Sequence, residues 1–325
     1  MSQNIGQKIL FNKLKILVGE KDFIHEISNI IPVSTAGIYR RINGITLLTI
    51  DEITLLSKKF KISYNELFSY SPTDEIIFKF DYVNQDFVKY LNNITQNLNH
   101  ISSFEDHIMI YSVKDLPIWH YFTCKFLTNF KIFYWLRTIK KDPDFQDKKF
   151  EFDCIPNQYL VAAKKSLQAY SKVNSEELWT PSSLNVMIGQ IKYYFESGII
   201  SKTQFEIITS KLLDLLDSIK NEAAKGIKGC YSKKGSYKIY LSEIIGGDNV
   251  VYVRGGNEQI TFHPPVLMNY LHTKDIKFCN YIKEAFDRAK GTAELISVIS
   301  EKNRNALFNG FKHNVLKLKK NHEYK

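Results

Sequence analysis

The sequence predicts a mainly α-helical protein in two domains. These are an all-helical N-terminal module at residues 1–71 and a larger, mostly helical domain at residues 72–325 with a small antiparallel β meander around residues 237–263. Three observations support this prediction. Apolar residues recur at the spacing of a helix face through most of the chain. The polar stretch at residues 69–73 is typical of a linker. Glycine pairs and alternating apolar residues occur together at residues 237–263, which indicates short strands.

The N-terminal module is expected to contain four helices, at residues 5–17, 23–30, 34–43 and 49–60. Pro32 ends the second helix, because proline lacks a backbone donor and disfavours the helical conformation of the residue before it. Ser34 is suited to cap the start of the third helix. Asn43 and Gly44 are suited to the left-handed turn at its end. A helix, a break of three or four residues and a second helix form a helix-turn-helix.

The third helix can bury either of two faces. If Ile38 is the core anchor, the outward residues are Thr35, Ala36, Tyr39 and Arg40. If Ala36, Tyr39 and Ile42 form the buried stripe, the outward residues are Thr35, Gly37, Arg40 and Arg41. Thr35 and Arg40 face outward in both arrangements.

These residues resemble the lambda-repressor-like, Cro-type family of bacterial and phage regulators. The points of similarity are the Ser34-Thr35 start, Ile38-Tyr39-Arg40 and the Asn43-Gly44 turn. A further helix follows at residues 49–60, and a closing segment with Ile62, Ser63, Leu67 and Phe68 replaces the family's usual ending of a small residue, Val-Ser and aromatic-Leu-Leu. The first motif helix departs from the family, which usually has a glutamine at Phe23 or Ile24 and an alanine at Glu26 or Ile27. The resemblance covers roughly the first fifth of the chain and implies a module that binds double-stranded DNA.

The candidate DNA-binding residues lie on the third helix and at its two ends. They are Ser34, Thr35, Gly37, Tyr39, Arg40, Arg41 and Asn43. Arginine can reach guanine in the major groove or neutralise a phosphate, and a hydroxyl at a helix N-terminus can bind the adjacent phosphate. The net charge of +10 also suits a polyanionic partner. Because one short helix spans few base pairs, we expect a homodimer, held together through the larger domain. That domain could also sense a small-molecule or protein effector.

The larger domain is expected to be a series of helices with few strands. The helices are expected at residues 85–100, 119–139, 159–170, 181–195, 203–224, 265–271, 275–289 and 292–318. A short strand is expected at residues 107–113, and the meander comprises residues 237–243, 250–253 and 258–262. The aromatic residues of segment 119–139 could line a pocket or an interface, although core packing is the simpler interpretation.

Several other classes of site lack their sequence signals. The four cysteines are far apart, and His263, His272 and Cys279 are irregularly spaced, so neither a metal nor another cofactor is expected. The sequence has no nucleophile elbow, no H-E-x-x-H and no convincing carboxylate pair, which argues against an enzyme. No apolar run is long enough to cross a membrane, so a cytoplasmic protein is expected. The main alternative function is a protein-interaction or scaffold module whose helix-turn-helix no longer binds DNA.

Overall fold

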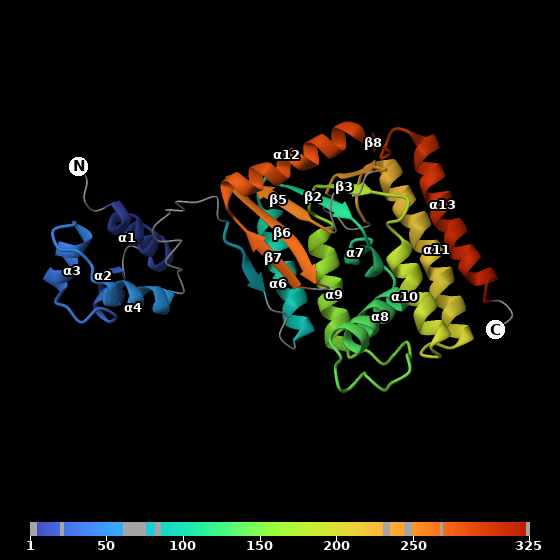
Figure 1. Cartoon of the computed structure of the whole chain (residues 1–325), viewed down its shortest axis with the longest axis horizontal. Helices are drawn as coiled ribbons and strands as arrows, with labels where there is room; N and C mark the ends of the chain where they lie inside the picture. The colour runs from blue at the N-terminus through green and yellow to red at the C-terminus, as the bar shows by residue number, and fades with distance from the viewer. Residues whose placement is uncertain are drawn as a thin grey trace. The chain divides into compact units, whose positions relative to one another are not determined.

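The protein divides into two compact units, Met1–Glu75 and Ile76–Lys325 (Figure 1). The structure, a computed structural model, describes residues 5–19, 23–60, 76–81, 86–229, 235–243, 249–266 and 269–322. The expected linker at residues 69–73 and the expected closing segment at residues 62–68 lie outside the described residues.

The described part of the first unit consists of helices, as expected. They are α1 (Ile5–Val18), α2 (Phe23–Ser28), α3 (Thr35–Ile42) and α4 (Ile50–Phe60). Their apolar faces meet in one core around Leu14, Ile27, Ile38 and Leu56, all fully buried. Each helix is too short to be stable alone in water, so this shared core stabilises all four.

The second unit corrects the predicted fold class, because it is built on a large mixed β-sheet and not on helices with a small meander. The strands are β1 (Lys79–Asp81), β2 (Ile108–Val113), β3 (Ser175–Trp179), β4 (Tyr237–Leu241), β5 (Val251–Gly255), β6 (Glu258–Val266), β7 (Asn269–Thr273) and β8 (Glu294–Leu295). Within the described residues they form one eight-stranded sheet in the order β1-β7-β6-β5-β2-β3-β4-β8. The β2–β3 and β3–β4 pairs are parallel, and the other pairs are antiparallel.

The expected meander is therefore only partly correct. The predicted strands near residues 237, 250 and 258 exist, and β5 and β6 form the expected hairpin around Gly256. However, β4 pairs with β3 and β8 on the far side of β2 and not with β5. The helix expected at residues 265–271 is wrong, because its second half is strand β7, paired with β6 and β1.

Helices cover both faces of the sheet (Figure 1). They are α6 (Phe87–Ile101), α7 (Ile118–Tyr121), α8 (Lys125–Tyr134), α9 (Asn157–Tyr170), α10 (Asn185–Glu196), α11 (Lys202–Lys225), α12 (Ile276–Thr292) and α13 (Glu301–Lys320). Alternate residues of β2 face the two layers, as the twofold period of a strand requires. Ile110 packs in a small core with Phe286 of α12, whereas Met109 and Tyr111 belong to the main core on the opposite face.

The expected single helix at residues 119–139 is interrupted. Helix α7 ends at Tyr121, α8 starts at Lys125, and a π-helical turn at Trp135–Ile139 closes the segment. The break after α7 leaves Cys124 at the start of α8. The residues of this break, Phe122, Thr123 and Cys124, line a pocket.

Candidate functional sites

The exposed face of α3 is the first candidate site. Ile38 is fully buried, so it is the core anchor of this helix. Thr35, Ala36, Tyr39 and Arg40 are therefore exposed, as the first of the two expected registers requires. The Ser34 hydroxyl caps the helix by accepting a hydrogen bond from the Gly37 N–H at 3.3 Å.

Arg41, unlike the exposed Arg40, is held by hydrogen bonds to other residues of the first unit. Its guanidinium donates to both carboxylate oxygens of Glu52 on α4, at 2.7 and 3.0 Å, and to the Gly37 carbonyl at 3.3 Å. The same carboxylate accepts the Thr49 N–H at 2.9 Å. Burial would raise the pKa of Glu52, but the hydrogen bonds and charge of Arg41 outweigh it and lower the pKa. Arg41 thus fixes α3 against the start of α4.

The turn after α3 is held by Gln7 of α1. The Gln7 amide donates to the carbonyls of Arg41 and Thr46, and its oxygen accepts the Leu48 N–H at 2.9 Å. Gly44 has the predicted positive φ, 73°, and Asn43 is exposed at the helix end. Of the predicted site residues, the structure leaves Ser34, Thr35, Tyr39, Arg40 and Asn43 exposed, while Gly37 and Arg41 are half-buried.

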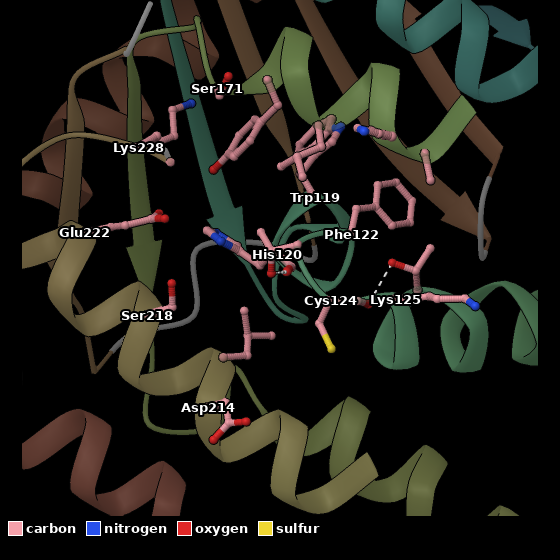
Figure 2. A pocket seen from close by; sticks show the side chains of 18 of the residues that line it. Trp119, His120, Phe122, Cys124, Lys125, Ser171, Asp214, Ser218, Glu222 and Lys228 are labelled. Atoms are coloured by element: carbon pink, nitrogen blue, oxygen red, sulfur yellow. Dashed lines mark hydrogen bonds between the residues drawn. The ribbon is translucent and has the colours of Figure 1, made fainter. Parts of the chain in front are cut away.

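The second candidate site is a pocket of about 950 Å³ in the second unit (Figure 2). Its walls come from α7, the start of α8, α9, α11 and the residues that follow α11. Trp119, Phe122 and Phe126 line it, whereas the neighbouring Phe130 and Phe133 are fully buried in the main core. The aromatic segment at residues 119–139 therefore supplies both a pocket wall and core packing.

At the end of the pocket that His120 and Tyr170 line, Glu177 of β3 contacts both residues and is completely buried. Its carboxylate accepts hydrogen bonds from the Tyr170 hydroxyl, from Trp179 Nε1 at 2.8 Å and from the Tyr237 hydroxyl at 3.1 Å. His120 Nε2 lies 3.6 Å from Oε2 of the same carboxylate. Burial would raise the pKa of Glu177, but the hydrogen bonds and charge of His120 and the Tyr170 hydrogen bond outweigh it and lower the pKa. Glu177 is thus a buried anion that accepts hydrogen bonds from three donors.

Lys228 lies at the same end of the pocket and is 1% exposed. Its Nζ has no hydrogen-bond partner in the part of the chain that the structure describes, and it lies 3.6 Å from the centre of the Tyr170 ring. Burial lowers the pKa of Lys228 to about 7, against the opposing charges of Glu177 and Glu222. Burial likewise raises the pKa of the half-buried Glu222. The end of the pocket therefore holds an ammonium group that lacks a hydrogen-bonding acceptor among the described residues.

A pocket was one of the roles expected for the aromatic segment at residues 119–139, and Trp119, Phe122 and Phe126 of that segment line this pocket. Lys228, Glu222 and Glu177 were not expected there, because none of them belongs to a metal, phosphate-loop or catalytic motif. Among the described residues, no group of three or more His, Cys, Asp or Glu side chains could hold a metal ion. Cys279, one of the three residues considered for a metal, is buried with its sulfur 3.6 Å from the Thr273 carbonyl.

No helix in the described ranges combines the length and the apolar character needed to cross a membrane. Comparisons with protein families, with characterised proteins and with solved structures returned no match for this chain. Function is therefore inferred from the chemistry of the two sites alone.

Proposed function

We propose that this chain is a cytoplasmic, sequence-specific DNA-binding regulator of transcription that acts as a dimer and inserts α3 into the major groove. The observation that carries the proposal is the contrast between two adjacent arginines. Arg41 is held by Glu52 and the Gly37 carbonyl, whereas Arg40 is exposed on a helix whose core anchor, Ile38, is fully buried. A rigidly placed helix with an outward arginine is what direct reading of a base requires.

The two ends of α3 would have different roles on DNA. Helix α3 has eight residues and is therefore about 12 Å long. The major groove of DNA is wide enough to admit an α-helix. The N-terminal N–H groups and the exposed Thr35 hydroxyl suit a phosphate, because the helix dipole places partial positive charge there. Arg40, more than one turn further along, would reach a guanine edge, and Tyr39 beside it would contact a base or a sugar. Arg41 would act only through the position of α3.

A second function is also supported, because the loop after α3 and the first residue of α4 expose apolar side chains. Ile45, Leu47 and Ile50 are 65%, 62% and 78% exposed. Exposed apolar side chains close together in the sequence suit a protein partner. The alternative proposal is therefore that the first unit is a docking module for another protein and does not bind DNA.

Selection from a pool of random duplexes with the full-length chain separates the two proposals. A DNA-binding regulator should enrich a short motif, whereas a docking module should leave the pool unchanged. Arg40→Ala should weaken binding to the enriched site by about 1–3 kcal/mol and relax the preference at one base position.

The matched control is Arg288→Ala, which removes the same charge from an exposed position on α12 in the second unit. It should keep the wild-type base preference. An Arg40→Ala variant that retains both affinity and preference would contradict the assignment of α3 as the recognition helix.

A further inference from the structure

The pocket in the second unit has the size and the wall of a small-molecule site. Its volume of about 950 Å³ lies within the range of pockets that hold small ligands, about 300–1,000 Å³. Trp119, Phe122 and Leu215 provide apolar surface, the first two from α7 and the turn after it and the third from α11. Trp119 is also held in place, because its ring stacks on Tyr170 with centroids 4.4 Å apart and its Nε1 donates to Ser166 at 2.9 Å. A flat apolar group would find a preformed surface there.

At the polar end of the pocket, the Lys228 ammonium group has no hydrogen-bond acceptor among the described residues, so an anion would suit this end. Lys228 is buried and lines the pocket, and its Nζ has no acceptor among the described residues. A buried ammonium group without a hydrogen bond is destabilising, and the Tyr170 ring compensates for only part of this. Figure 2 shows Lys228 and Glu222, which lie just after and within the last turn of α11, together with His120 of α7. An acceptor from a ligand would complete the arrangement.

The neighbouring carboxyl groups restrict the charge of that ligand. The Glu177 carboxylate lies close enough to Lys228 to raise the pKa of the lysine. The oxygens of that carboxylate already accept hydrogen bonds from Tyr170, Trp179 and Tyr237. Glu222 lines the pocket beside it. Two carboxyl groups at one end oppose a second negative charge on the ligand. A singly charged group is favoured over a doubly charged phosphate.

We propose that this pocket binds a small organic monoanion, with a carboxylate directed at Lys228 and an apolar, preferably aromatic, body against Trp119 and Leu215. Neither its evidence nor its test involves DNA, so the proposal stands or falls independently of the function of the first unit.

Three naphthalene compounds of the same shape test the proposal by calorimetry on the full-length chain. 2-Naphthoate carries one negative charge, 2-naphthamide carries none, and 2-naphthyl phosphate carries up to two. The naphthoate should bind about tenfold or more tightly than the amide, as expected for a charge-assisted hydrogen bond, and also more tightly than the phosphate. Equal binding of acid and amide, tighter binding of the phosphate, or no binding of any of the three at about 1 mM would overturn it.

Variants locate the bound probe. Lys228→Met should remove the preference for naphthoate over naphthamide, while Lys225→Met, an exposed lysine on the same pocket, should change it less than about twofold. Ser218→Trp places a bulky ring in the pocket from an exposed position on α11 and should abolish binding of both compounds. If Ser218→Trp binds both as the wild type does, the probe lies elsewhere and the proposal is wrong. The comparison of acid with amide on the wild-type chain needs no variant to fold.

Discussion

Replacing Lys228 by methionine should change how the stability of the second unit depends on pH. The ammonium group is 1% exposed, and burial lowers the pKa of Lys228 to about 7. In the unfolded chain a lysine keeps its proton to about pH 10.4. Between these two values the unfolded state binds more protons than the native state, so the free energy of unfolding rises with pH. Methionine has a similar length but does not titrate, so the Lys228→Met variant lacks this pH-dependent contribution to the free energy of unfolding.

The size of the effect follows from the two pKa values. One pKa unit corresponds to about 1.4 kcal/mol. With a native pKa of about 7, Lys228 is half protonated at pH 7 and almost neutral at pH 9. Raising the pH from 7 to 9 should therefore stabilise the wild type by about 2 kcal/mol relative to Lys228→Met. The charges facing this ammonium group are Glu177 and Glu222, and both favour its protonated form.

The assay is urea unfolding followed by tryptophan fluorescence at pH 7 and pH 9. Trp119, Trp135 and Trp179 are the three tryptophans of the chain and all lie in the second unit, so the signal reports on that unit alone. The matched control is Lys225→Met, whose side chain is exposed three residues earlier. Its stability difference from the wild type should be the same at both pH values. If the difference for Lys228→Met is also the same at both, Lys228 is not a buried lysine with a lowered pKa and no acceptor among the described residues.

Three further predictions concern the first unit, the Glu177 network and the oligomeric state. Arg41→Met and Glu52→Gln should each weaken DNA binding without changing the preferred sequence, because the Arg41–Glu52 pair positions α3; altered base preference in either variant, measured by the same duplex selection, would show that Arg41 reads a base. Glu177→Gln should destabilise the second unit by about 2–4 kcal/mol, because the side-chain NH2 of glutamine would face the donors that now point at the carboxylate. A decrease in the free energy of unfolding of less than about 1 kcal/mol, measured by urea unfolding at pH 7, would contradict this. The full-length chain should sediment as a homodimer, and a monomer at about 50 μM would exclude a dimer of ordinary affinity.

The first unit could be predicted from the sequence because its signals are local. Ser34 caps α3, Pro32 falls in the break before it, and Gly44 adopts the left-handed turn after it. Each of these depends on residues within one or two turns of the chain. The choice between the two registers of α3 was not local, because it depended on whether Ile38 or Ala36 meets residues from α1, α2 and α4. Ile38 is fully buried and Ala36 is exposed.

The sheet of the second unit was underestimated because its central strands lack a distinctive local pattern. Strand β3 is only five residues long and contains Glu176 and Glu177, so it does not resemble the apolar run of a buried parallel strand. Its partners are β2, more than 60 residues earlier, and β4, about 60 residues later. Parallel strands need long crossover connections, so no turn sequence marks the pairing. By contrast, β5 and β6 are joined by a tight turn at Gly256 and were predicted.

An aromatic pocket wall was among the expectations from the sequence, but the buried lysine of the pocket could not be predicted, because its burial depends on residues outside its own neighbourhood. Lys225 and Lys228 lie three residues apart, yet the first is exposed and the second is buried. Helix α11 ends at Gly226, whose φ of 67° redirects the chain. A side chain at that position would also meet Val298, because a Cβ there would lie 2.6 Å from its Cγ2. After this turn the Lys228 N–H bonds to the Gly235 carbonyl, so the backbone runs beside the start of β4 and not along the surface of α11. The burial of Lys228 thus follows from the turn at Gly226 and from the backbone pairing beside β4. Neither feature can be recognised from a lysine in a lysine-rich stretch of sequence.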